Sequence, residues 1–163
     1  MKKFLKFLFV SAFALLCVTG ISSCSKDDDD QLIDSANIIG AWLASYAEWW
    51  EKENGVITDK GTEPEADPIV YDFHENGKVD VYDDEADFRN GIIDHTSIWK
   101  IKGDVLTIWD EEDEEKDEED RDEMIRKIES IGSETLVLSQ YDKEKEDGVT
   151  FEEYYKTTFI RLK

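Results

Sequence analysis

Short runs of alternating apolar and polar residues fill the chain from Ile38 onward, separated by Gly, Asn and Asp. Alternation with a period of two, rich in Val, Ile, Thr and aromatic residues, is typical of β-strands with one buried face. It predicts eight strands, at residues 40–50, 68–74, 78–83, 92–101, 105–110, 123–130, 135–141 and 151–162. No amphipathic helix pattern of the length that a parallel crossover needs separates them, so we expect an antiparallel meander.

The hairpin after the second predicted strand has a register that the buried face selects. A three-residue loop ending at Gly77 pairs Phe73 with Val79. It also pairs Tyr71 with Val81, so that apolar partners share one face. Because a one-residue slip exchanges the two faces of a strand, we expect this register. Gly77 then takes the left-handed conformation of a bulge.

The next hairpin has a two-residue turn that begins at Gly103. This turn pairs Ile101 with Leu106, and Trp99 with Ile108, and all four apolar side chains then lie on one side. Leu136 and Leu138 repeat the pattern in the seventh predicted strand, after a second turn that begins at Gly132. We therefore expect one continuous apolar face.

Eight antiparallel strands with one apolar face must bury that face in a sandwich or a closed barrel, and closure also removes exposed edges. The predicted fold class is all-β: an eight-stranded antiparallel meander closed into a small barrel at residues 38–163, without disulfides. Eight strands leave an interior that side chains fill or that admits one small ligand. The side chains expected inside, as core or as cavity lining, are Tyr46, Tyr71, Phe73, Val79, Val81, Trp99, Ile101, Leu106, Ile108, Leu136 and Leu138.

Both ends of this region carry recognisable motifs. Residues 38–42, with Gly40 and Trp42, resemble the Gly-x-Trp signature of lipocalins, and residues 159–162 resemble the last strand, whose arginine packs across that tryptophan. With the two hairpins between them, residues 38–163 resemble the small lipocalin-like lipoprotein families of the Bacteroidota. The resemblance implies a lipocalin-like barrel with Trp42 and Arg161 as the pair at its base. The aromatic side chains expected on the inner face indicate a small apolar or amphipathic ligand.

The first residues read as a processing signal. Three lysines precede a 13-residue apolar run from Phe7 to Thr19, which matches a secretory signal and is shorter than the ~20 residues of a membrane-spanning helix. The run is followed by Ile21-Ser22-Ser23-Cys24, which resembles the lipobox of bacterial lipoproteins. The resemblance implies that residues 1–23 are removed and that Cys24 is acylated. The alternative is an ordinary signal peptide with an incidental cysteine.

The segment at residues 24–37 is expected to be a flexible acidic tether. Ser25-Lys26 and four aspartates follow Cys24 and resemble the signal that exports lipoproteins of the Bacteroidota to the cell surface. A run of like charges also keeps a tether extended, so both roles are compatible. Cys17 lies in the removed region and Cys24 is consumed by the lipid, which leaves no thiol for a disulfide. The expected location is the outer membrane, lipid-anchored and exposed at the cell surface.

The charge balance limits the partners. The chain has 19 basic and 41 acidic residues and a formal charge of −22; removing residues 1–23 takes away three lysines and no acid, which leaves −25. Nucleic acid is excluded, because its binding depends on Lys and Arg at the phosphates. An anionic membrane surface is repelled, so acyl chains are the expected membrane contact. We expect a monomer.

Residues 110–123 carry 12 acids in 14 positions. A mobile solvated loop, weak cation binding and a protein contact are the three interpretations. Neither this run nor Asp83-Asp84-Glu85 has the ligand spacing and turn glycine of an EF-hand. His74 and His95 lack a third ligand in the sequence. We therefore expect no metal and no cofactor.

No motif for a nucleophile, a phosphate loop or a zinc-binding helix is present. The predicted function is therefore a surface-displayed lipoprotein that is not an enzyme and binds a small apolar or amphipathic ligand in its barrel. The alternative is a structural or protein-interaction module that uses its outer face or the acidic loop 110–123. Trp49-Trp50 and Tyr154-Tyr155 each place one ring outward in any register, unless the 51–67 loop covers them.

Overall fold

A computed structural model describes residues 35–64, 68–113 and 121–163. Strands dominate this part of the chain, as the alternating pattern predicted. The elements are η1 (Ser35–Ile38), β1 (Gly40–Glu53), β2 (Val56–Pro64), β3 (Val70–Phe73), β4 (Lys78–Tyr82), α1 (Glu85–Asn90), β5 (His95–Lys102), β6 (Val105–Asp110), η2 (Glu111–Asp113), β7 (Glu123–Ile131), β8 (Thr135–Glu146) and β9 (Val149–Arg161). Both cysteines lie outside the described residues.

The sheet closes on itself. The strands follow the order β2-β1-β3-β4-β5-β6-β7-β8-β9, and β1 also pairs with β9. Every pairing is antiparallel. Eight strands, all except β2, therefore form a closed barrel, and the predicted fold class is confirmed. Closure leaves none of the eight strands as a free edge along its barrel portion.

Both predicted hairpin registers are confirmed. Phe73 pairs with Val79 in the β3–β4 hairpin, and Gly77 has a φ of 81° in its loop. Ile101 pairs with Leu106 in the β5–β6 hairpin, whose turn begins at Gly103 with a φ of 65°. Placing apolar partners on one face was therefore sufficient to predict the register of both hairpins.

The closure between β1 and β9 is fixed at one end by Arg161. Its guanidinium carbon lies 4.0 Å from the centre of the Trp42 ring, and Trp42 pairs with Arg161 in the register of the two strands. The guanidinium donates to the carbonyl oxygens of Ile39 and Asn37, both at 2.6 Å, and to that of Ser133 at 2.8 Å. One side chain therefore ties together three segments that are far apart in the sequence.

Gly40 is required beside this arginine. Its φ of 113° is a conformation that side chains with a Cβ rarely adopt. A Cβ at this position would also stand 2.8 Å from Nη1 of Arg161. The Gly-x-Trp spacing thus has a local physical reason: glycine leaves room for the cation, and Trp42, two residues on, provides the ring beneath it.

The barrel core is made of side chains from every wall. Trp42 has no exposed surface and its indole Nε1 donates to the Ile38 carbonyl at 2.6 Å. The buried cluster consists of Ile38, Trp42, Ala44, Phe73, Val79, Leu106, Ile108, Ile128, Leu136, Leu138 and Phe159. Most of the interior is therefore packed with protein side chains.

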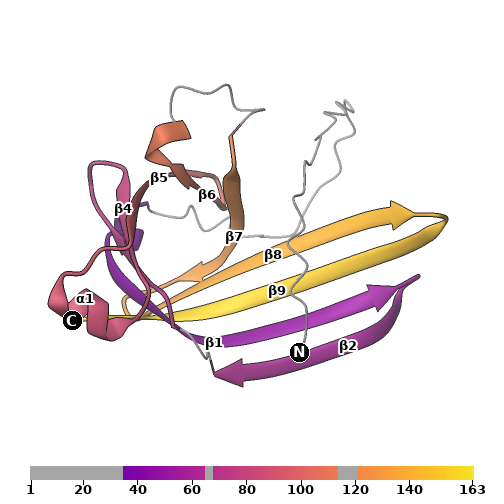
Figure 1. Cartoon of the computed structure of the whole chain (residues 1–163). Helices are drawn as coiled ribbons and strands as arrows, with labels where there is room; N and C mark the ends of the chain where they lie inside the picture. Colours follow the sequence, from indigo (N-terminus) through magenta and orange to yellow (C-terminus); the bar gives the residue numbers. More distant parts are fainter. Residues whose placement is uncertain (1–34, 65–67, 114–120) are drawn as a thin grey trace, which may run out of the picture. The chain divides into compact units, whose positions relative to one another are not determined.

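The ninth strand corrects the sequence-based expectation. Residues 51–67 were expected to be a loop, but β2 forms a hairpin with β1 through Asn54 and Gly55, whose φ values are 50° and 81°. An equivalent turn at Asp147 and Gly148, with φ values of 50° and 86°, extends β8 and β9 beyond their predicted ends. Asn-Gly and Asp-Gly turns with two positive φ values are the usual type I′ hairpin turns. Figure 1 shows the two long hairpins, β1–β2 and β8–β9.

A bulge in β1 reverses the predicted position of Tyr46. The register between β1 and β9 shifts between Ala44 and Tyr46, and the Ser45 hydroxyl donates to the Thr158 carbonyl at 2.9 Å. An extra residue in one strand exchanges the faces of all residues after it. Ala47 is consequently buried in place of Tyr46, which is 39% exposed. The expectation that Tyr46 lies inside was wrong.

The segment before β5 was also mispredicted. Residues 92–94 were expected to begin a strand, but they follow the short helix α1, and Ile92 and Ile93 are 57% and 46% exposed. Asp84 caps this helix by accepting a hydrogen bond from the Asp87 amide at 2.8 Å. The acidic run at 83–87 therefore begins a helix.

Truncation of the base tryptophan tests this architecture. We expect Trp42→Ala to lower the free energy of unfolding by about 3–5 kcal/mol, because it opens a cavity in a fully packed site. Trp50→Ala is the matched control, since Trp50 stacks on Tyr154 outside the core with ring centres 5.5 Å apart. Its cost should be smaller than that of Trp42→Ala, because Trp50 is only partly buried. Equal costs in urea denaturation would contradict the role given to Trp42.

Candidate functional site

A small cavity remains between the core and the part of the barrel where β1, β8 and β9 continue past their neighbours. Its volume is about 130 Å³. A cavity of about 150 Å³ is sufficient for benzene in an engineered protein core, so this space suits one small chemical group. It is lined by Ala44, Ile69, Tyr71, Met124, Arg126, Leu138, Tyr155, Thr157 and Phe159.

Arg126 is the one positively charged side chain among these lining residues. It lies directly opposite the buried Leu106 in the β6–β7 register, and it alternates along β7 with Met124 and Ile128, which pack in the core. The strand therefore turns this guanidinium toward the interior. Burial lowers the pKa of Arg126 from its ordinary value, although Tyr71, Asp142 and Tyr155 act in the opposite direction. An arginine remains charged even so.

The partners of Arg126 are few. Its Nη1 donates to the carbonyl oxygen of Ile125 at 2.9 Å. Among residues 35–64, 68–113 and 121–163, no carboxylate forms an ion pair with it. Arg126 is partly buried, so its charge loses part of its hydration, and charged side chains in such positions are usually paired. This guanidinium is therefore an unusual component of a barrel interior.

Tyr71 forms the aromatic side of the cavity. Its ring centre lies 6.0 Å from that of Phe73 and 5.8 Å from that of Phe159. Its hydroxyl contacts Sδ of Met124 at 3.8 Å. Burial raises the pKa of Tyr71, so the hydroxyl stays protonated at neutral pH. It can act as a hydrogen-bond donor to a group in the cavity.

The predicted interior residues fall into three groups. Phe73, Val79, Val81, Leu106, Ile108 and Leu136 are buried, and Trp99 and Ile101 pack against the core as partly buried residues. Tyr71 and Leu138 do line the cavity, whereas Tyr46 lies outside. Arg126 was not among the predicted interior residues. Its alternation with Met124 and Ile128 in the predicted strand 123–130 was the signal that could have found it.

The inner face of the barrel continues onto the projecting four-stranded sheet β2-β1-β9-β8. A hollow of about 320 Å³ lies there and shares Tyr155 with the cavity. Trp49 pairs with Gly61 across β1 and β2, and its ring occupies the space where a Cβ on Gly61 would stand. A tryptophan that covers a glycine in this way stabilises an outer strand.

Four acids lie in register across this sheet. Asp59, Glu51, Glu153 and Asp142 are successive cross-strand partners on β2, β1, β9 and β8. Burial, together with Glu51, Asp142 and Glu144, raises the pKa of Glu153. Like charges directly opposite each other in a sheet are destabilising. The row therefore places a negative field in the hollow that adjoins the cavity at Tyr155.

The opposite face of the same sheet carries an aromatic row. Trp50 stacks on Tyr154 at an interplanar angle of 16°, and Tyr141 lies 6.1 Å from Trp50. The ammonium of Lys52 lies 3.9 Å from the centre of the Trp50 ring. Tyr141 is 52% exposed. Of the two predicted aromatic pairs, Trp50 and Tyr154 thus share the face opposite to that of Trp49 and Tyr155.

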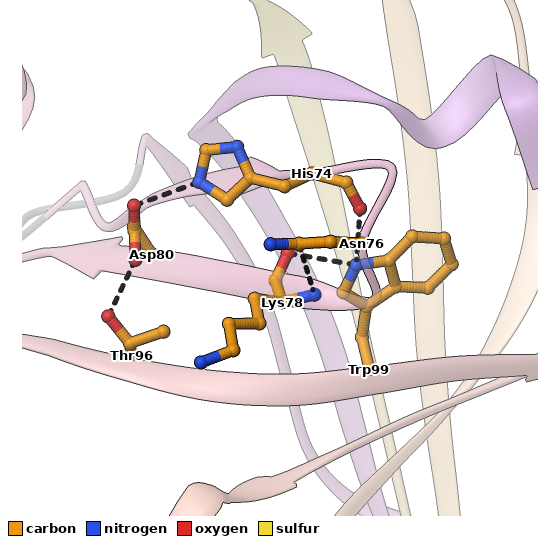
Figure 2. Close-up of polar contacts among 6 residues, drawn as sticks. All are labelled: His74, Asn76, Lys78, Asp80, Thr96 and Trp99. Atoms are coloured by element: carbon orange, nitrogen blue, oxygen red, sulfur yellow. Dashed lines mark hydrogen bonds and ion pairs between the residues drawn. The ribbon is translucent and has the colours of Figure 1, made fainter.

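A polar cluster around Asp80 holds the β3–β4 hairpin (Figure 2). Nε2 of His74 lies 2.8 Å from one Asp80 oxygen, and the Thr96 hydroxyl donates to the other at 2.6 Å. Burial alone would raise the pKa of Asp80, but the hydrogen bonds with Thr96 and His74 outweigh it, and the pKa is lowered. The Trp99 indole donates to the carbonyls of Lys78 and His74 at 3.0 and 3.3 Å. These contacts join β3, β4 and β5, so their role is structural.

The remaining candidate residues are dispersed. His95 contacts Asp94 at 2.7 Å, far along the chain from His74. In the described part of the chain, no three His, Cys, Asp or Glu side chains are grouped to hold a metal ion. Of the acidic segment 110–123, residues 114–120 lie outside the described residues, as do Cys24 and the predicted signal and lipid-attachment region. None of the helices in the described ranges is long and apolar enough to cross a membrane.

Removing one charge from the acid row tests its energetic effect. We expect Glu153→Gln to raise the free energy of unfolding at pH 7 by about 0.2–1 kcal/mol, the range for a cross-strand pair. Because the pKa of Glu153 is raised in the folded state, its charge destabilises the fold at neutral pH. The difference should vanish below about pH 3, where the carboxyl is protonated in both states.

Glu152→Gln is the matched control for this measurement. Glu152 points to the opposite face and contacts the Lys143 ammonium at 2.7 Å, which contributes to its lowered pKa. Its neutralisation should not stabilise the protein. Thermal denaturation measures the stability of both variants. Equal stabilisation by the two would show that the effect comes from net charge alone.

Comparison with known proteins gives a family and two structural neighbours. A lipocalin-like protein from Bacteroides uniformis superposes with a TM-score of 0.47 at 15% identity, covering 77% of this chain and 99% of that chain. The attachment invasion locus protein Ail of Yersinia pestis superposes with a TM-score of 0.30 at 11% identity, covering 76% and 99%. No curated protein matches the sequence. The model of a family of unknown function, DUF6679, matches residues 67–161, and the chain belongs to this family.

Proposed function

We propose that this protein is a non-catalytic binding module that holds one small amphipathic molecule at the open end of its barrel. The supporting observation is the cavity of about 130 Å³, which combines an apolar wall with a guanidinium and a tyrosine. Small-molecule sites typically have this composition, with mostly apolar walls and a few polar groups that set orientation. The packed base around Trp42 leaves this end as the route of entry.

Native mass spectrometry of protein purified from the cells that produce it tests the binding proposal. We expect a fraction of the protein to carry a noncovalent adduct of low mass. Ala44→Leu should reduce this fraction, because Ala44 lines the cavity and a larger side chain fills it. Tyr46→Ala is the control, since Tyr46 lies outside. Protein that is free of adduct in every preparation would contradict the proposal.

The module is also proposed to be a lipoprotein held at the outer membrane by acyl chains on Cys24 and displayed at the cell surface. The support is the position of this cysteine after a 13-residue apolar run and before an acidic segment. Several acyl chains give stable attachment, whereas one chain gives only marginal binding. A formal charge of −25 on the processed chain would keep the domain away from anionic lipid headgroups.

Substitution of the two cysteines tests the anchor. Cys24→Ala should abolish incorporation of labelled palmitate and leave the protein in the aqueous phase of a detergent partition. Cys17→Ala should behave like the wild type, because Cys17 lies within the removed segment. Palmitate incorporation by Cys24→Ala would contradict the assignment.

An interaction module that uses the outer face is the second candidate. It is favoured by the aromatic row of Trp50, Tyr154 and the half-exposed Tyr141. Exposed aromatic rings of this kind are enriched where proteins meet partners. A neighbour that is cross-linked on intact cells to the wild type but not to Tyr141→Ser, with the low-mass adduct unchanged, would favour this candidate.

A further inference from the structure

Several basic residues that face outward have a carboxylate partner, whereas Arg126 has none among the described residues. Lys127, the next residue along β7, lies 3.2 Å from a carboxylate oxygen of Glu129. Lys78 and Lys143 likewise contact Glu111 and Glu152, each at 2.7 Å. A chain with 41 acids readily supplies carboxylates to its cations. The inward guanidinium of Arg126 has only the Ile125 carbonyl among the described residues.

The surroundings of Arg126 select the charge and size of a ligand group. A guanidinium presents parallel N–H donors that match the two oxygens of a carboxylate. The tyrosine hydroxyl of Tyr71 adds a neutral donor on the same cavity wall. The rest of the wall is mostly apolar and is lined by Ala44, Ile69, Met124, Leu138 and Phe159, together with Thr157 and Tyr155. Arg126 is the one cation among the lining residues, so a second negative charge on the ligand would have no partner there.

We infer that the cavity binds the carboxylate of a small amphipathic molecule, with Arg126 as its ion-pair partner and the apolar part of the ligand against Ala44, Leu138 and Phe159. This inference rests on the proposed binding function and specifies its ligand class. Asp142 stands in electrostatic range of Arg126 at the rim without reaching ion-pair distance. The acid row in the adjoining hollow repels negative charge, and this repulsion increases with each charge that a ligand carries.

Hexanoate and hexan-1-ol are suitable probes, because they share a short apolar chain and differ in the anionic group. Calorimetric titration at pH 7 and low salt should show hexanoate binding at least about tenfold more tightly than hexan-1-ol, as one charge-assisted pair provides. Arg126→Gln should remove this preference, because hexanoate loses its ion-pair partner. Lys127→Gln, an equal charge change on the opposite face, should leave both affinities unchanged.

The outcomes separate the inference from the function on which it rests. Equal affinities for the two probes, unchanged by Arg126→Gln, would overturn the carboxylate assignment and leave the binding function intact. Absence of binding by both probes would overturn the inference and count against the cavity itself as a binding site. Preference for hexanoate in Arg126→Gln as strong as in the wild type would also overturn the inference.

Two further measurements do not depend on the folding of Arg126→Gln. In the wild type, the carboxyl pKa of ¹³C-labelled hexanoate, followed by NMR, should fall on binding, because a cation beside it favours the charged form. An unshifted pKa would overturn the inference. Arg126→Met should melt at a higher temperature than the ligand-free wild type, since an unpaired inward charge is lost. A lower melting temperature would identify Arg126 as a structural residue and remove the premise.

Discussion

The contact between Arg161 and Trp42 is the constraint on which the rest of the structure depends. A single sheet of eight strands that does not fold over into a sandwich buries its apolar face by closing, so that its first and last strands meet. Arg161 joins the start of β1 to the end of β9. Its guanidinium lies on the Trp42 ring and donates to three carbonyl oxygens. A cation on an indole contributes about 0.5–2 kcal/mol, and the three hydrogen bonds add geometric specificity.

Beyond this closed base, the strands at the other end of the barrel differ in length. β1, β8 and β9 continue well past the residues that pair with β3 and β7, and β2 joins them as an outer strand. Since the inner face runs without interruption onto this projection, the cavity opens toward a surface with aromatic rings and acids. The exposed portion of β8 consists mostly of charged residues, which opposes pairing with other chains. The same four strands thus carry the entry to the proposed site.

Much of this fold was predictable from residue parity, and the errors have specific causes. The pairing of Phe73 with Val79 followed from apolar partners on one face, because only one register satisfied it. Tyr46 was misplaced because a bulge at Ser45 reverses parity without any signal in the apolar pattern. β2 was missed because its residues are almost all exposed, so no alternation marks them; the Asn54-Gly55 turn was the available signal. Arg126 was overlooked because a charged residue at an inward position contradicts the pattern used to find strands.

Proton NMR of the closing strands tests the central claim directly. If β1 and β9 close the barrel, nuclear Overhauser effects should connect backbone protons of Ala44 with those of Phe159, and protons of the Trp42 ring with the Arg161 side chain. Connections within β1–β3 and β8–β9 that occur without any between β1 and β9 would describe an open sheet and contradict the account.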